Sequence, residues 1–235
     1  PRLTATGKGA NLPETLGYKG TGEKVGITGK SDHENGMRFN VNHKYENYLI
    51  ICHIKIGKGQ EALNCKTDGP NHGSCTSLPK CVWIEPNLNI SSGKLDMTSE
   101  WPHPKGHDGM PCPSCKTIGS IQTGAWLGWA IGAWYEGEFR KIEVWVDKSG
   151  TGAEWQKVAS EVDKGQITNP ELAKRKLFLE GKGLEAEIRC HGATGGDADI
   201  KDGWVYEITP PSGASAAYAS INDFLYNYSR RGRIL

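Results

Sequence analysis

Charge of one sign and long apolar runs are both missing from this sequence. Its 28 Lys and Arg residues face 27 Asp and Glu residues, so the net charge is +1. A protein that binds nucleic acid carries a clear basic excess, and we therefore expect no nucleic-acid partner. The longest apolar run, residues 125–135, is interrupted by two glycines and is too short to cross a bilayer. We expect no membrane-spanning segment.

Helical periodicity is nearly absent as well. Only residues 169–175, with Pro170 in the first turn, and residues 220–228 have a helical pattern. Strand-like runs bounded by Gly, Asn and Asp are the dominant pattern: residues 48–56, 81–85, 94–101, 126–135, 139–147, 155–162, 177–180, 184–190 and 203–208. Such a series is typical of an antiparallel sandwich or barrel, and so few helices exclude a parallel α/β fold.

We therefore predict an all-β fold, a two-sheet antiparallel β-sandwich (jelly roll) over residues 39–209. Residues 1–38 are expected to form an irregular N-terminal segment. Residues 210–235 follow a break at two prolines and are expected to form a short C-terminal tail, with the helical pattern at residues 220–228.

The seven cysteines indicate an oxidising compartment. Four of them lie in a stretch rich in Gly, Pro, Asn and Ser, which suits disulfide bonds between loops of a secreted protein; these are Cys65, Cys75, Cys81 and Cys112. Two N-x-Ser triplets, at Asn89 and Asn227, are compatible with glycosylation of such a protein. The sequence therefore predicts a secreted protein with disulfide bonds.

One part of the chain resembles a known superfamily. Trp126 and Gly128 lie in one predicted strand, residues 144–147 (Val-Trp-Val-Asp) end the next, and a Gly-rich loop leads to Trp155. This pattern resembles the later half of the concanavalin A-like jelly roll, which includes laminin-G-like lectins, β-glucanases and alginate-type polysaccharide lyases. The resemblance extends over residues 39–208 and implies a jelly-roll fold that recognises polysaccharide.

The motifs for catalysis in that superfamily are incomplete. Glucanases carry an E-x-D-x-E strand, whereas the corresponding strand here has only Glu143 and Asp147. On one strand these two residues lie about 13 Å apart, too far for a carboxylate pair that hydrolyses a glycosidic bond. Glu185 and Glu187, about 7 Å apart on one strand face, remain an alternative pair that a solvated strand face explains equally well.

The resemblance to lyases implies a second catalytic set. β-Elimination on a uronate needs a group that neutralises the carboxylate and a His or Tyr that moves a proton. The Q-x-H and Y-x-K-x-G-x-Y motifs of alginate-type lyases are missing, and the nearest candidates are His53 with Tyr135 and Arg140. A solvated strand face is the alternative interpretation of His53.

Eight tryptophans point to sugar as the ligand, because aromatic faces stack on the C–H faces of pyranose rings. Strand alternation puts four residues on one face, where they would form a platform with an aromatic surface, a cation and a carboxylate: Phe139, Lys141, Glu143 and Trp145. His53 and Lys55 on the polar face of another strand would extend it. The alternative is that a loop covers Trp145.

Two clusters could bind metal. His103, His107, Cys112 and Cys115 have the chemistry of a tetrahedral zinc site, and a disulfide bond between the cysteines is the alternative. Asp197, Asp199 and Asp202 follow a Gly-Gly turn and offer oxygen ligands for calcium. The resemblance also favours calcium, and a polar turn without metal is the alternative.

The sequence thus predicts a secreted polysaccharide-recognising β-sandwich, either a lectin-like module or a lyase. An alternative function is a structural subunit of an extracellular assembly. The tail supports this alternative, because the aromatic residues 218–228 and the arginines that follow could dock on the sheet edge of a neighbouring copy. The tail would then be the contact of a homo-oligomer.

Overall fold

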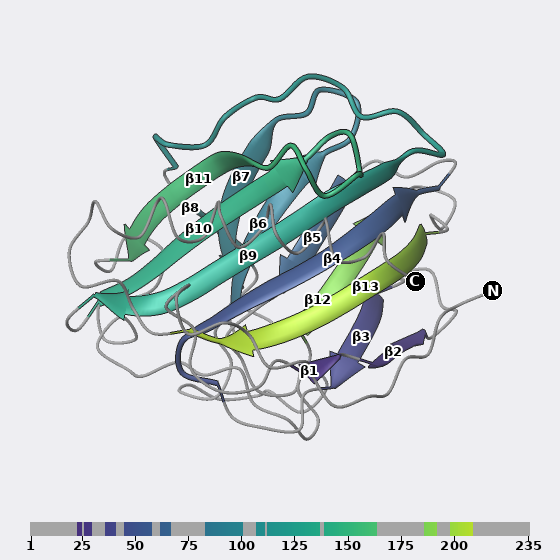
Figure 1. Cartoon of the computed structure of the whole chain (residues 1–235). Helices are drawn as coiled ribbons and strands as arrows, with labels where there is room; N and C mark the ends of the chain where they lie inside the picture. The colour runs from purple at the N-terminus through teal and green to yellow at the C-terminus, as the bar shows by residue number, and fades with distance from the viewer. Residues whose placement is uncertain are drawn as a thin grey trace.

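The structure, a computed structural model, describes residues 23–24, 26–29, 36–40, 45–57, 62–66, 83–100, 107–110, 112–136, 139–163, 186–191 and 198–208. These residues form antiparallel strands in two sheets that lie one behind the other (Figure 1), and no helix occurs among them. The predicted all-β, two-sheet sandwich is confirmed. Within the same ranges, no helix long and apolar enough to cross a membrane is found.

One sheet has six strands in the order β1-β13-β4-β9-β10-β11. Their bounds are Glu23–Lys24 for β1, Ala198–Glu207 for β13, Tyr48–Ile56 for β4, Trp126–Glu136 for β9, Phe139–Asp147 for β10 and Gln156–Asp163 for β11. The long strands predicted at residues 48–56 and 139–147 are confirmed. Neighbours distant in sequence, such as β13 and β4, make this a jelly-roll type of connection, in which the chain passes between sheets.

The second sheet has seven strands in the order β2-β3-β12-β5-β6-β7-β8. Their bounds are Gly26–Gly29 for β2, Gly36–Asn40 for β3, Ala186–His191 for β12, Ala62–Lys66 for β5, Trp83–Asn89 for β6, Leu95–Glu100 for β7 and His107–Met110 for β8. All pairings in both sheets are antiparallel.

The predicted boundary at residue 39 is wrong, because β1, β2 and most of β3 come from the segment that was expected to be irregular. The first two are very short and lie at sheet edges, where short strands and glycine are common. Such strands carry too few alternating residues to be recognised in a sequence. The predicted helical stretches, the strand at 177–180 and the C-terminal tail lie outside the described residues.

The six-stranded sheet carries buried apolar side chains on both of its faces. Its inner face packs on the second sheet, and the inner core contains residues of both sheets, among them Ile50, Trp129 and Val144 from one and Leu88 and Met97 from the other. Each fully buried side chain of this size contributes about 1.5–3 kcal/mol to folding.

The face turned away from the second sheet, here called the outer face, has its own buried cluster. This outer cluster contains residues of the six-stranded sheet and Ile208, which follows β13: Leu49, Ile51, Ala130, Trp134, Trp145, Tyr206 and Ile208. An antiparallel sheet usually has one polar face. These outer-cluster residues are at most 4% exposed, so the centre of the outer face is covered as well.

Residues 112–121, here called the bridging segment, close one side of the sandwich between the two sheets. On the six-stranded side, the backbone N–H of Lys116 donates to Val158 O of β11 at 2.9 Å. On the other side, the N–H groups of Ile118 and Ile121 donate to Gly93 O and Ile90 O, each at 2.9 Å. The segment therefore ties an edge strand of one sheet to the β6–β7 turn of the other.

Candidate functional site

Polar and aromatic side chains converge at one end of the outer face. His53 of β4 is paired with Gly128 of β9 on one side and with Lys201 of β13 on the other. Because side chains alternate along a strand, His53 lies on the same face as Ile51 of the outer cluster. We call this group the His53 site: His53, Trp126, Trp155, Lys201 and Asp202.

Gly128 makes room for an aromatic ring in this site. A Cβ atom at Gly128 would lie 2.8 Å from Cη2 of Trp155 and 2.9 Å from Cβ of Asp147. The indole of Trp155 therefore occupies the space above the glycine, and its ring centroid lies 6.1 Å from that of His53. Its Nε1 donates to Gly152 O at 3.0 Å, which fixes the orientation of the ring.

Asp147 organises the loop that carries Trp155. Its carboxylate is completely buried and accepts hydrogen bonds from the N–H of Ser149 at 2.9 Å, from its hydroxyl at 2.6 Å, and from the N–H of Gly152. Carboxylates that accept local backbone N–H groups are common in tight loops. Asp147 is therefore a structural residue, which positions Trp155 beside His53.

A β-bulge brings two charged residues of β13 to the site. Lys201 pairs with His53, but the next pair on this face is Trp204 with Ile51, so β13 contains one extra residue here. Asp202 takes up this irregularity with a φ of 54°. As a result, Asp202 Oδ2 lies 3.7 Å from Nδ1 of His53, and Lys201 Nζ lies 4.2 Å from the centroid of the Trp126 ring.

The environment of His53 favours its neutral form. Only 5% of the residue is exposed, and Nδ1 has no hydrogen-bond partner among the described residues. Burial lowers the pKa of His53 below its usual 6.5, and the charge of Lys201 lowers it further. The carboxylates of Asp202 and Asp147 oppose this shift but do not reverse it. A neutral imidazole can donate or accept a hydrogen bond with a polar ligand.

This pKa shift predicts that acid destabilises the fold. The unfolded chain binds a proton at His53 near pH 6.5, where the folded chain does not. The contribution of the neutral His53 to the free energy of unfolding is therefore complete above pH 6.5 and is lost as the pH falls below it. We expect the unfolding free energy of the wild type to fall there more steeply than that of His53→Gln, by up to ~1.4 kcal/mol per pH unit. Urea denaturation between pH 5 and 8 measures both slopes, and equal slopes would contradict the prediction.

Two members of the predicted sugar platform are buried. Glu143 and Trp145 lie on the predicted face, but they are only 1% and 2% exposed, so their prediction as exposed ligand contacts is wrong. The indole of Trp145 belongs to the outer cluster and fills the space left by Gly132, where a Cβ atom would lie 3.2 Å from its Cζ3. Lys141 and Phe139, on the same face, are half-buried.

Glu143 is held by its neighbours on β11. Its Oε1 accepts hydrogen bonds from the hydroxyl of Ser160 at 2.9 Å and from Lys157 Nζ at 3.4 Å. Burial lowers the pKa of Lys157, while the charge of Glu143 opposes the shift. The carboxylate therefore has a local structural function between β10 and β11.

The three predicted lyase residues do not come together. Arg140 and Tyr135 alternate with the outer-face residues and lie on the inner face of the sheet, whereas His53 lies on the outer face. Arg140 pairs with Tyr135 of β9, and His53 pairs with Gly128 of the same strand. These two positions on β9 are seven residues, or about 23 Å, apart. Arg140 is 2% exposed, lies over the Tyr48 and Tyr135 rings at 5.3 and 4.8 Å, and donates to Glu46 O. It packs the end of the inner core.

The predicted zinc site loses two of its four ligands, because Cys112 and Cys115 form a disulfide bond and zinc binds the thiolate form of cysteine. His103 lies outside the described residues, and of His107 only the backbone is described. Among the described residues there is no group of three or more His, Cys, Asp or Glu side chains that could hold a metal ion.

The remaining predicted residues are only partly described. Asp197 and Glu185 lie outside the described residues, and only the backbones of Asp199 and Glu187 are described. Asp202 lies in the His53 site, and calcium binding by the 197–202 turn stays a prediction. Lys55 is half-buried and lies opposite Trp126, so the sequence placed both His53 and Lys55 correctly on this face.

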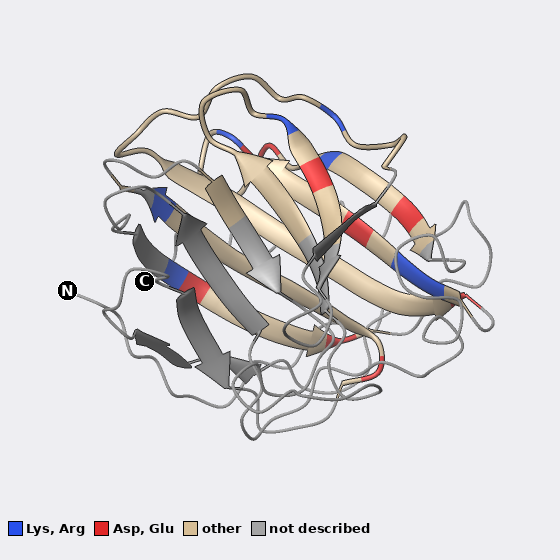
Figure 2. Ribbon diagram, turned by 180° about the vertical axis from the view of Figure 1, so that it is seen from behind, with Lys and Arg blue, Asp and Glu red and all other residues tan. Residues whose placement is uncertain are grey.

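Sequence reasoning missed Trp126, Trp155 and Lys201 as site residues. Trp126 could have been found, because it lies two positions from Gly128 and therefore on the same strand face. The other two depend on the loop at Asp147 and on the bulge in β13. Charged residues of both signs are scattered along the described strands in Figure 2, so charge alone does not mark the site.

No protein-family model matches the chain, and no curated protein matches it. Among solved structures, it is similar to a carbohydrate-binding module from Bacillus subtilis, with 8% identity, coverage of 80% of this chain and 92% of that chain, and a TM-score of 0.35. An alginate lyase from Pseudomonas aeruginosa has 15% identity, coverage of 77% and 81%, and a TM-score of 0.37.

A third similar structure is the carbohydrate-binding module of a Ruminococcus gnavus sialidase bound to α2,3-sialyllactose, with 10% identity, coverage of 88% and 97%, and a TM-score of 0.39. At these identities the similarity concerns the arrangement of the strands only.

Proposed function

We propose that this protein binds glycans at the His53 site on the outer face of its six-stranded sheet. The observation that carries the proposal is the convergence of half-buried indoles with polar groups around a buried, neutral histidine. Sugar sites in proteins combine apolar faces for the C–H groups with a few fixed hydrogen-bonding groups for the hydroxyls. Trp126 and Trp155 supply the first, and His53, Lys201 and Asp202 supply the second.

The same geometry supports binding in preference to catalysis. The buried carboxylates of Glu143 and Asp147 are engaged by Ser160 and Lys157 and by the 149–152 loop. His53 is far from Tyr135 and Arg140. Glu143 and Asp147 thus do not act as the carboxylate pair that hydrolysis requires, and the predicted lyase residues are not assembled.

A secreted location also belongs to this proposal. The Cys112–Cys115 disulfide supports it, because such bonds persist mainly in oxidising environments outside the cytosol. An extracellular polysaccharide is the corresponding ligand. The C-terminal tail, on which the alternative function as an assembly subunit depends, lies outside the described residues.

The test removes one aromatic and one polar contact. A glycan array first identifies a ligand, and titration calorimetry then compares Trp126→Ala and Lys201→Ala with the wild type. Each variant is expected to weaken binding at least tenfold, about 1.4 kcal/mol, because the sugar loses a stacking face or a hydrogen-bond donor. Both residues are half-buried, so we expect the melting temperature to change little.

Phe139→Ala is the matched control, because Phe139 is also a half-buried aromatic residue on the outer face. It lies opposite Glu136, at the end of β9 that is far from Trp126. It should bind the glycan like the wild type. If Phe139→Ala weakens binding and Trp126→Ala does not, the glycan binds at the other end of the sheet and the proposed site is wrong. An array that shows no ligand for the folded wild type contradicts glycan binding itself.

A further inference from the structure

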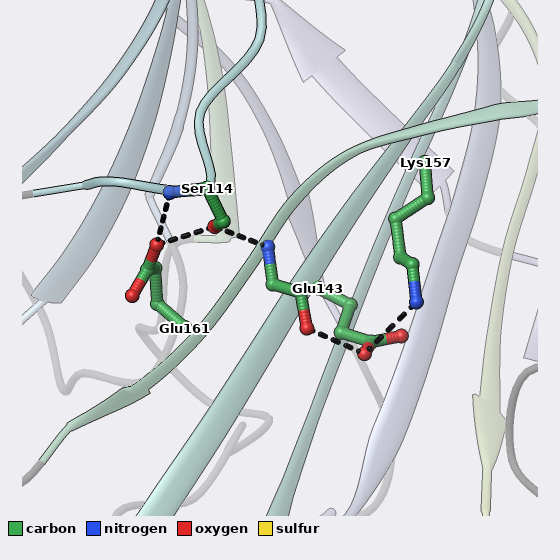
Figure 3. Close-up of polar contacts among 5 residues, drawn as sticks. Ser114, Glu143, Lys157 and Glu161 are labelled. Carbon is green, nitrogen blue, oxygen red and sulfur yellow. Dashed lines mark hydrogen bonds and ion pairs between the residues drawn. The ribbon is translucent and has the colours of Figure 1, made fainter. Parts of the chain in front are cut away.

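A chain of hydrogen bonds runs from Ser114, which lies between Cys112 and Cys115, to Glu143 on the outer face (Figure 3). Ser114, between the two cysteines, donates from both its N–H and its hydroxyl to Glu161 Oε1. The same hydroxyl oxygen accepts the N–H of Ser160 at 2.9 Å. The hydroxyl of Ser160 in turn donates to Glu143, which also binds Lys157.

Glu161 makes this contact important for stability. The residue is 8% exposed, and its carboxylate accepts hydrogen bonds from the N–H and the hydroxyl of Ser114. A buried carboxylate that loses its donors bears a desolvation penalty without compensation. Burial of the Glu161 carboxylate under the bridging segment therefore depends on Ser114 staying in this position.

The disulfide fixes the position of Ser114. Cys112 and Cys115 enclose only Pro113 and Ser114, and the N–H of Cys115 donates to Cys112 O at 3.0 Å, which closes a tight turn. Both cysteines are half-buried and pack against the inner core. One position further along, Lys116 makes the backbone hydrogen bond to β11. The disulfide bond thus holds together the contacts that Ser114 and Lys116 of the bridging segment make with β11.

We propose that the Cys112–Cys115 disulfide is a redox-controlled clamp, which holds the bridging segment on β11 when oxidised and releases it when a dithiol reduces the bond. In the reaction, a thiolate of the dithiol attacks one sulfur of the bond, which forms a mixed disulfide and releases the other cysteine. The second thiol of the dithiol then attacks its own partner sulfur in the mixed disulfide, which releases the remaining cysteine and leaves the dithiol as its cyclic disulfide. Two electrons and two protons pass to Cys112 and Cys115, which become thiols. Ser114 then leaves Glu161 and Ser160.

The experiment measures amide hydrogen exchange in the full chain, with and without dithiothreitol. The N–H groups of Ser160 and Lys116 are the reporters, because their acceptors lie across the clamp contact. After reduction we expect both to exchange about tenfold faster or more, as in a local opening, while Ile131 in the central strand β9 stays protected. Alkylation followed by mass spectrometry shows that Cys112 and Cys115 have been reduced.

The variant Cys112→Ser with Cys115→Ser separates this bond from the other cysteines. It should show fast exchange at Ser160 and Lys116 with or without dithiothreitol. Ser114→Ala keeps the disulfide and should speed exchange at Ser160 alone, so it serves if the double variant does not fold. Unchanged exchange in the reduced wild type overturns the clamp, as does an equal effect of dithiothreitol on the double variant. None of these readouts involves a glycan.

Discussion

Trp145→Ala is expected to lower the free energy of unfolding by about 3–5 kcal/mol, the usual cost of removing a large buried aromatic side chain. Trp145 is 2% exposed and packs in the outer cluster, against Gly132. Truncation would leave a cavity that the sheet cannot close, because the strands on both sides are fixed by their own hydrogen bonds. Urea denaturation followed by tryptophan fluorescence and circular dichroism measures the loss.

Lys141→Ala is the control for this prediction. Lys141 lies on the same face and the same strand but is half-buried, and its truncation should cost less than about 1 kcal/mol. If Trp145→Ala retained the stability of the wild type while glycan affinity fell, Trp145 would be an exposed ligand contact. The outer cluster would then not exist as described.

Gly93→Ala is expected to be the second severe substitution, with a loss of about 2–4 kcal/mol from backbone strain together with overpacking. Gly93 has a φ of 67°, which disfavours any side chain. A Cβ atom there would also overlap the backbone of Gly119 in the bridging segment. The segment would have to move, and the hydrogen bond from Ile118 N–H to Gly93 O would be lost.

Gly124→Ala separates the two causes. Gly124 has a similar φ of 83°, but a Cβ atom there would have no atom within 4 Å. Its substitution should cost only the conformational strain, about 1 kcal/mol. Chemical denaturation of both variants gives the difference, which measures how firmly the bridging segment is held. Equal losses would show that the segment gives way at no cost.

Alternation predicted the strands and their faces well, but it could not predict what covers a face. Residues 48–56 and 139–147 were placed correctly because their pattern has a period of two. The same pattern put Trp145 on the outer face, where it was expected to be exposed. A strand that is buried on both faces can still contain a charged residue, such as Glu143, if that residue is paired inside the protein. Its sequence then alternates like that of a strand with one exposed face.

The site was only half predictable for a related reason. His53 and Lys55 follow from alternation on β4, but the extra residue in β13 changes the alternation after Lys201 and cannot be recognised from residue types. Cys112 and Cys115 present the same difficulty, because a C-x-x-C pair suits both zinc and a disulfide. The bond between the two sulfur atoms, which the residue pattern does not specify, shows that the local chain forms the disulfide.

The bridging segment also affects how this protein meets copies of itself. Among the described strands, β11 is the last of its sheet, and an open strand edge is a template for a strand from another molecule. Lys116 and Ser114 already occupy Val158 O and the N–H of Ser160 on that edge. While they stay there, an incoming strand cannot form a regular ladder along β11. Polymerisation through this edge would require the chain first to give up its own contacts.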